Sequence, residues 1–115
     1  PVQHIEVSDN DRAAAAAFYA AVFVFATQDF PDMNYSMVMT GDGSPTLGLN
    51  PVGDNNPAGQ VIPYFTSDDV AATLAKATAA GGKTVMESTP IPTVGDVGMF
   101  VDPTGNLMGV WKPDQ

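Results

Sequence analysis

The chain has 115 residues, with 13 Asp and Glu against 4 Lys and Arg, one His and no Cys. This length suits one domain with a single core, and the lack of cysteine excludes disulfides, thiolate metal sites and a cysteine nucleophile. The net charge of −9 argues against nucleic acid and anionic membranes as partners, because clustered Lys and Arg hold both.

No stretch reaches the roughly 18 apolar residues that a membrane-spanning helix needs. The most apolar window, residues 13–26, follows an acidic segment and lacks the basic lead-in of a signal peptide. We therefore predict a cytoplasmic protein without a membrane partner.

The first half of the chain predicts the order β-α-β-β-β. Residues 2–7 alternate as in a strand, and the polar segment 8–11 offers capping side chains to a helix over the alanine-rich residues 12–22. Phe18 and Tyr19 are placed to anchor that helix. Strands are then expected at 23–30, 35–40 and 46–50, with a Gly- and Pro-containing turn at 41–45.

The second half predicts the same order after a linker at 53–59. A strand at 61–66 leads to the capping residues 67–69 and to a helix over 70–80, which Gly81 and Gly82 end. Strands follow at 83–87, 98–101 and 107–111, with a turn at 102–106 before the last.

The two halves also match locally, which indicates an internal repeat. Asp11 and Asp69 begin similar segments at an offset of 58 residues, and Gly48 and Gly109 occupy similar strands at an offset of 61. We predict an α+β fold in one domain, 1–115, built from two βαβββ modules at about 1–52 and 60–115. Neither module is long enough to close a core alone, so the modules are expected to pack on each other.

Several motifs together resemble the vicinal oxygen chelate superfamily, which includes glyoxalase I, bleomycin-resistance proteins, fosfomycin-resistance enzymes and extradiol dioxygenases. They are His4-Ile5-Glu6-Val7, Arg12-Ala13, Phe18-Tyr19, Ala79-Ala80-Gly81-Gly82 and the turn Asp102-Pro103-x-Gly105-Asn106. The resemblance covers essentially the whole chain. It implies that the two modules curl into an incomplete mixed-sheet barrel around a cavity, and that the protein is a homodimer.

The same resemblance implies a divalent metal held by side chains of the first and last strands of the modules, where it acts as a Lewis acid. The four corresponding positions are His4, Gly48, Ile62 and Gly109. Only His4 is a competent ligand, and one imidazole does not hold a metal at useful occupancy. We therefore predict no metal and no other cofactor.

His4 and Glu6 are the candidate catalytic residues. Alternation along a strand puts them on one face, where they can form a general base pair or supply two ligands to a different metal site. The alternative interpretation is structural, with His4 a hydrogen-bonded strand residue and Glu6 at a cavity rim or a dimer interface.

The candidate ligand-binding residues are Tyr64, Trp111, Ile62, Gly48 and Gly109. Tyr64 shares a strand face with Ile62, and Trp111 shares one with Gly109; both aromatic side chains offer a ring and a hydrogen-bond donor. Glycine inside a strand marks a bulge or a close approach. The two glycines either leave room for a bulky ligand or record the plain loss of metal ligands.

These observations predict a small-molecule binding protein that sequesters an aromatic or cationic compound without a metal, as bleomycin-resistance proteins do in antibiotic resistance. The alternative is a lyase, isomerase or dioxygenase-like enzyme that uses His4 and Glu6, with or without a divalent metal.

Overall fold

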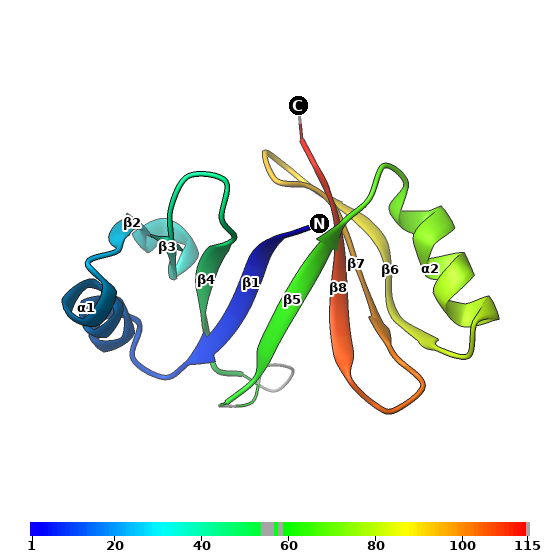
Figure 1. Cartoon of the computed structure of the whole chain (residues 1–115), viewed down its shortest axis with the longest axis horizontal. Helices are drawn as coiled ribbons and strands as arrows, with labels where there is room; N and C mark the ends of the chain where they lie inside the picture. Colours follow the sequence, from blue (N-terminus) through cyan, green and yellow to red (C-terminus); the bar gives the residue numbers. More distant parts are fainter. Residues whose placement is uncertain (54–56, 58, 115) are drawn as a thin grey trace. The chain divides into compact units, whose positions relative to one another are not determined.

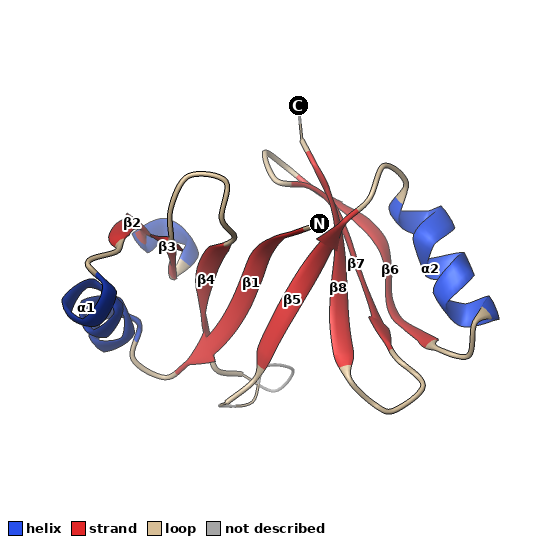
Figure 2. Cartoon of the chain, viewed as in Figure 1, coloured by secondary structure: helices blue, strands red, loops and turns tan. Residues whose placement is uncertain are grey.

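The computed structural model describes residues 1–53, 57 and 59–114, and the order β-α-β-β-β occurs twice in it (Figures 1 and 2). The first series is β1 (Val2–Asp9), α1 (Arg12–Phe23), β2 (Ala26–Phe30), the short 3-10 helix η1 (Pro31–Met33), β3 (Tyr35–Met39) and β4 (Thr46–Pro51). The second is β5 (Val61–Thr66), α2 (Val70–Ala79), β6 (Lys83–Ile91), β7 (Gly95–Val101) and β8 (Leu107–Pro113). The predicted α+β class with two βαβββ modules is confirmed. Residues 54–56 and 58 of the predicted linker lie outside the described residues.

The chain divides into two compact units. The N-terminal unit is Gln3–Ile62, and the C-terminal unit is Pro63–Gln115 together with Pro1–Val2. Strands of the N-terminal unit lie in the order β2-β3-β4-β1, and those of the C-terminal unit in the corresponding order β6-β7-β8-β5. In each unit the first strand is parallel to the last, and the other pairs are antiparallel. Each unit therefore holds a mixed sheet of the same design.

Helix α2 has the stronger packing of the two helices. The Asp69 side chain caps it by accepting a hydrogen bond from the Ala72 backbone N–H at 3.0 Å. Val70 and Leu74 are buried from the helix, and they form a core cluster with Val110 of β8. This cluster fixes α2 against its own sheet.

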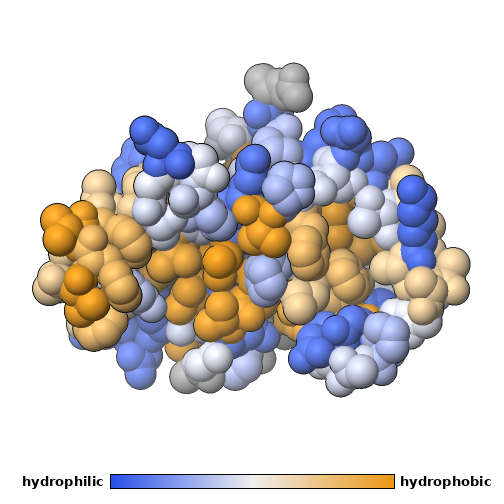
Figure 3. Space-filling view, in the orientation of Figure 1, coloured by the Kyte–Doolittle hydropathy of each residue, from blue (hydrophilic) through white to orange (hydrophobic). Residues whose placement is uncertain are grey.

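Helix α1 is capped in the same way but buries no residue. Asp11 accepts a hydrogen bond from the Ala14 N–H at 3.0 Å, while Phe18, Val22 and Phe23 are each more than half exposed. Figure 3 shows the resulting gathering of apolar side chains over α1, at the left of the view. Within the described residues, no helix is long and apolar enough to cross a membrane.

The predicted strand at 23–30 begins too early. Phe23 still belongs to α1, where its ring stacks on those of Tyr19 and Phe25. Val24 ends the helix in the left-handed conformation, with φ at 60° and its N–H bonded to the Ala20 carbonyl. The β-branched and aromatic residues that favoured a strand were thus overridden by contacts between rings on the helix surface.

The predicted strands at 83–87 and 98–101 are too short. β6 continues to Ile91 and β7 starts at Gly95, so the two strands form a longer hairpin. Pro90 of β6 cannot donate a backbone hydrogen bond to the ladder. β6 lies at the edge of the sheet in its unit and carries register shifts, and such an edge tolerates proline.

The predicted turn at 102–106 is a local hydrogen-bonded loop. Asp102 Oδ1 accepts hydrogen bonds from the backbone N–H groups of Thr104 and Asn106, both at 2.9 Å, and the Thr104 hydroxyl also donates to it. The hydrogen bonds from the Asn106 backbone and side-chain amide, with those from Thr104, lower the pKa of Asp102 to about 2. The ionised carboxylate therefore holds the turn between β7 and β8.

Candidate active site

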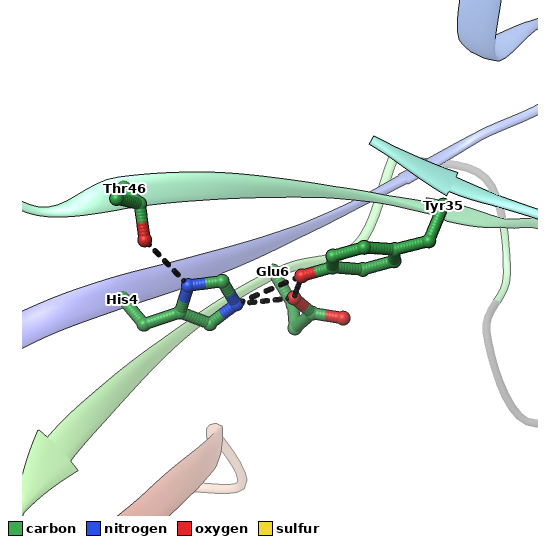
Figure 4. Close-up of polar contacts among 4 residues, drawn as sticks. All are labelled: His4, Glu6, Tyr35 and Thr46. Carbon is green, nitrogen blue, oxygen red and sulfur yellow. Dashed lines mark hydrogen bonds and ion pairs between the residues drawn. The ribbon is translucent and has the colours of Figure 1, made fainter. Parts of the chain in front are cut away.

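Four polar side chains meet on one face of the sheet in the N-terminal unit (Figure 4). His4 and Glu6 come from β1, Tyr35 from β3 and Thr46 from β4. His4 Nε2 lies 2.5 Å from Glu6 Oε2, and the Tyr35 hydroxyl donates to the same carboxylate oxygen at 2.6 Å. Thr46 Oγ1 lies 2.8 Å from His4 Nδ1. The pairing of His4 with Glu6 that strand alternation predicts is present.

Strand register brings these residues together. β1 runs parallel to β4 with His4 opposite Thr46 and Glu6 opposite Gly48. β3 pairs with the other side of β4, where Met37 lies opposite Gly48. Tyr35 shares the face of Met37 because it is two residues away, and its ring reaches across β4 to β1 (Figure 4).

Both ring nitrogens of His4 have hydrogen-bond partners. Nε2 pairs with the Glu6 carboxylate, and Nδ1 pairs with the Thr46 hydroxyl. Because a hydroxyl can donate or accept, Thr46 suits either tautomer of the ring.

The cluster is partly accessible to solvent. The side chains of His4 and Glu6 are each 17% exposed, so they are neither sealed in the core nor fully hydrated. A carboxylate held by two donors and still reachable can accept a proton or a hydrogen bond from a small molecule.

Gly48 is the reason that Glu6 and Tyr35 can meet. A Cβ atom at this position would lie 1.7 Å from the Tyr35 hydroxyl oxygen and 2.0 Å from Glu6 Oε2. The sequence left open whether the strand glycines make room for a ligand. In the structure, side chains of the neighbouring strands occupy the space over Gly48.

The same holds for Gly109 in the C-terminal unit. A Cβ atom there would lie 2.3 Å from the Tyr64 ring, and Tyr64 itself is only 7% exposed. Trp111 donates its indole N–H to the Val94 carbonyl at 3.0 Å, which ties β8 to the β6–β7 turn. Ile62 of β5 is buried. The donor that the sequence assigned to Trp111 for a ligand thus has a structural partner.

The donor set at the family's metal positions does not fit a metal ion. Of His4, Gly48, Ile62 and Gly109, only His4 carries a donor atom, and side chains fill the space over both glycines. In residues 1–53, 57 and 59–114, no three His, Cys, Asp or Glu side chains gather as a metal site requires.

Asp9 marks a second polar region of the N-terminal unit, on the opposite strand face from Glu6. A hollow of about 230 Å³ lies here, lined by Asp9, Asn10, Arg12, Asn34, Pro51 and Val52. Burial raises the pKa of Asp9, and the positive charge of Arg12 opposes this shift. Asp9 Oδ2 is buried, and it has no hydrogen-bond partner in the part of the chain that the structure describes.

Tyr35 and Thr46 were not singled out from the sequence. They lie 31 and 42 residues from His4, so their contact depends on the register of β3 and β4. The alternation of Tyr35, Met37 and Met39 was the available signal for the side-chain face of β3.

Two βαβββ units, each with its first strand parallel to its last, define a glyoxalase-type fold. The sequence matches the glyoxalase/bleomycin resistance protein/dioxygenase superfamily over residues 2–110. The chain belongs to this superfamily, and the resemblance seen in its motifs is confirmed.

Among curated proteins, the chain is 35% identical over 102 residues to the putative glyoxylase CFP32 of Mycobacterium bovis and of Mycobacterium tuberculosis. The match covers 86% of this chain but 39% of the relative, so the chain spans about two fifths of that protein's length.

Solved structures share the fold at low identity. The hypothetical protein BH1468 from Bacillus halodurans C-125 has a TM-score of 0.75 at 13% identity, covering 100% of this chain and 95% of that one. Methylmalonyl-CoA epimerase from Mycobacterium tuberculosis has a TM-score of 0.75 at 12% identity, covering 99% and 88%.

Proposed function

We propose that the protein is an acid–base enzyme that binds a small carbonyl compound at the His4–Glu6–Tyr35 cluster and moves a proton without a metal at the family's positions. The sequence alone favours binding without chemistry. We prefer catalysis over binding alone because Glu6 Oε2 is hydrogen-bonded to both His4 and Tyr35. Convergent titratable groups of this kind are typical of catalytic sites.

In the proposed reaction Glu6 is the general base. His4 and Tyr35 hold Oε2, while the other carboxylate oxygen points away from His4 (Figure 4). That oxygen accepts a proton from the carbon next to the substrate carbonyl, and the electron pair of the broken C–H bond forms an enolate. The Tyr35 hydroxyl turns from Glu6 to donate a hydrogen bond to the enolate oxygen. Glu6 exchanges this proton with water and returns a proton to the same carbon, so each cycle regenerates the carbonyl compound and exchanges the hydrogen beside its carbonyl with solvent.

Hydrogen exchange in D₂O tests the proposal without knowledge of the product. We would incubate the protein with pyruvate, acetoin and dihydroxyacetone and follow deuterium incorporation beside the carbonyl by proton NMR. A positioned general base contributes about 100- to 10,000-fold, so Glu6→Gln should lower the protein-dependent exchange rate at least ~100-fold.

Glu87→Gln is the matched control, because Glu87 is the other glutamate and lies exposed on β6 of the C-terminal unit. It should exchange at the wild-type rate. If wild-type protein exchanges all three compounds no faster than Glu6→Gln, the acid–base proposal is wrong.

The second candidate is binding without chemistry, as the sequence predicts. Met37 and Met39 favour it, because they share the strand face of Tyr35 and offer adaptable apolar surface beside a carboxylate. A net charge of −9 also attracts cationic compounds. With aromatic and cationic compounds added to the protein, this candidate predicts broadened ligand signals that EDTA does not change, and in the D₂O samples it predicts no deuterium incorporation. A homodimer and a cytoplasmic location stay predictions of the sequence.

A further inference from the structure

We infer that Gly48 is a positioning residue for this site, and that the site exists because β4 carries no side chain where β1 supplies a carboxylate. The inference rests on the proposed function. It goes beyond that function because Gly48 has no side chain with which to bind or react, and yet the cluster requires glycine at this position.

The geometry leaves no room for any other residue at this position while the cluster keeps its form. Non-bonded atoms pack best at about 3.5 Å or more. A Cβ atom on Gly48 would lie 1.7 Å from the Tyr35 hydroxyl oxygen, 2.7 Å from Tyr35 Cζ and 2.0 Å from Glu6 Oε2. Both groups that hold or form the proposed base would have to move.

The obstacle is confined to side chains. The nearest atoms belong to the ends of Tyr35 and Glu6 rather than to backbone, and Gly48 is not in a left-handed conformation. Gly48→Ala therefore displaces the cluster while β4 keeps its pairing with β1 and β3. A displacement of about 1 Å at a reacting group can cost about 100-fold in rate.

The single histidine of the chain makes the displacement measurable without a substrate. We would record the imidazole nitrogen and carbon resonances of His4 by NMR in wild type, Gly48→Ala and Gly98→Ala, with circular dichroism to check folding. Gly98 is the matched control: it is a buried strand glycine whose added Cβ would meet the side chains of Leu74 and Val70 at 2.8 and 2.9 Å, far from His4 in sequence and in the other unit.

The expected result is that Gly48→Ala shifts the His4 resonances and lowers deuterium exchange about 10- to 100-fold, whereas Gly98→Ala leaves the resonances unchanged. In a Tyr35→Phe background the closest contact is absent, whereas the contact of the added Cβ with Glu6 Oε2 remains. Adding Gly48→Ala should therefore still shift the His4 resonances relative to Tyr35→Phe alone, and this comparison keeps the test available if the single variant Gly48→Ala folds poorly.

Unchanged His4 resonances in Gly48→Ala, or equal shifts in Gly98→Ala, would overturn the inference. That outcome differs from failure of the proposed function. If the resonances shift but wild-type protein exchanges no compound, Gly48 positions the cluster and the acid–base role is wrong.

Discussion

The same strand register in the two units places side chains of different chemistry opposite a glycine. In the N-terminal unit the residue opposite the glycine of the last strand is Glu6, and in the C-terminal unit it is Tyr64. Both side chains lie over their glycine. In each unit a glycine of the last strand, Gly48 or Gly109, is covered by a side chain of the first strand. That side chain is acidic in the N-terminal unit and aromatic in the C-terminal unit.

The two units also differ in chemistry on their third strands, β3 and β7. Met37 pairs with Gly48 and Met99 with Gly109, so these methionines occupy equivalent positions. Two residues before them stand Tyr35, which donates to Glu6, and Val97, which has no polar side chain. One unit therefore carries the proposed chemistry, while the equivalent positions of the other hold Tyr64 and Val97 in place of Glu6 and Tyr35.

The helices differ in packing, and this difference gives the largest expected effect. Leu74 of α2 is 3% exposed, whereas Phe18 of α1 is 57% exposed. Leu74→Ala removes buried contacts and should lower the free energy of unfolding by ~2–5 kcal/mol. Phe18→Ala should cost under ~1 kcal/mol, because surface substitutions have small effects. Urea unfolding of both variants measures the difference, and equal losses would contradict the contrast between the helices.

The helix caps are alike in the two units, so their removal should have equal effects. Asp11 and Asp69 each accept a backbone hydrogen bond at 3.0 Å from the third residue beyond them. Asp11→Ala and Asp69→Ala should each lower the free energy of unfolding by ~1 kcal/mol. Urea midpoints at pH 7 test this. A loss seen only for Asp69→Ala would show that α1 unfolds apart from the measured transition.

The smallest expected effect is a pH dependence of opposite sign in the two units. The pKa of Asp102 falls from 3.8 to about 2 on folding, so its stabilisation is present above pH 3.8 and is lost as the pH falls through about 2. The pKa of Asp9 is raised above 3.8, so its contribution is full below pH 3.8 and is lost as the pH rises through the folded value.

Two variants separate these contributions. The free energy of unfolding of wild type minus that of Asp102→Asn should decrease from pH 4 to pH 2. The same difference for Asp9→Asn should decrease as the pH rises above 3.8. Subtracting the variant's free energy of unfolding from that of wild type cancels the titration of the other groups. If both differences changed in the same direction as the pH rises, the assigned hydrogen bonding of Asp102 and burial of Asp9 would be contradicted.

The sequence predicted what local patterns determine. The two module orders, the Asp11 and Asp69 caps and the shared face of His4 and Glu6 all depend on residues close together in the chain. The end of α1 was misplaced, because ring contacts of Phe23 outweigh strand propensity.

Half of the candidate site was beyond prediction. The contacts of Tyr35 and Thr46 with His4 depend on pairing across 31 and 42 residues, and a one-residue change of register would turn either side chain to the other face. The sequence marked Gly48 as an absent metal ligand and as a candidate ligand-binding residue that leaves room for a bulky molecule. The space that Gly48 leaves for Glu6 and Tyr35 depends on the same strand register.

The covered glycine also bears on how such a scaffold can change its chemistry. Because the last strand contributes only backbone beneath Glu6 and Tyr64, a different side chain on the first strand needs no compensating change below it. The two units already carry different side chains at this position, the carboxylate of Glu6 and the phenol ring of Tyr64. A single substitution at Glu6 or Tyr64 can therefore change the side chain that lies over the glycine without any change in the last strand.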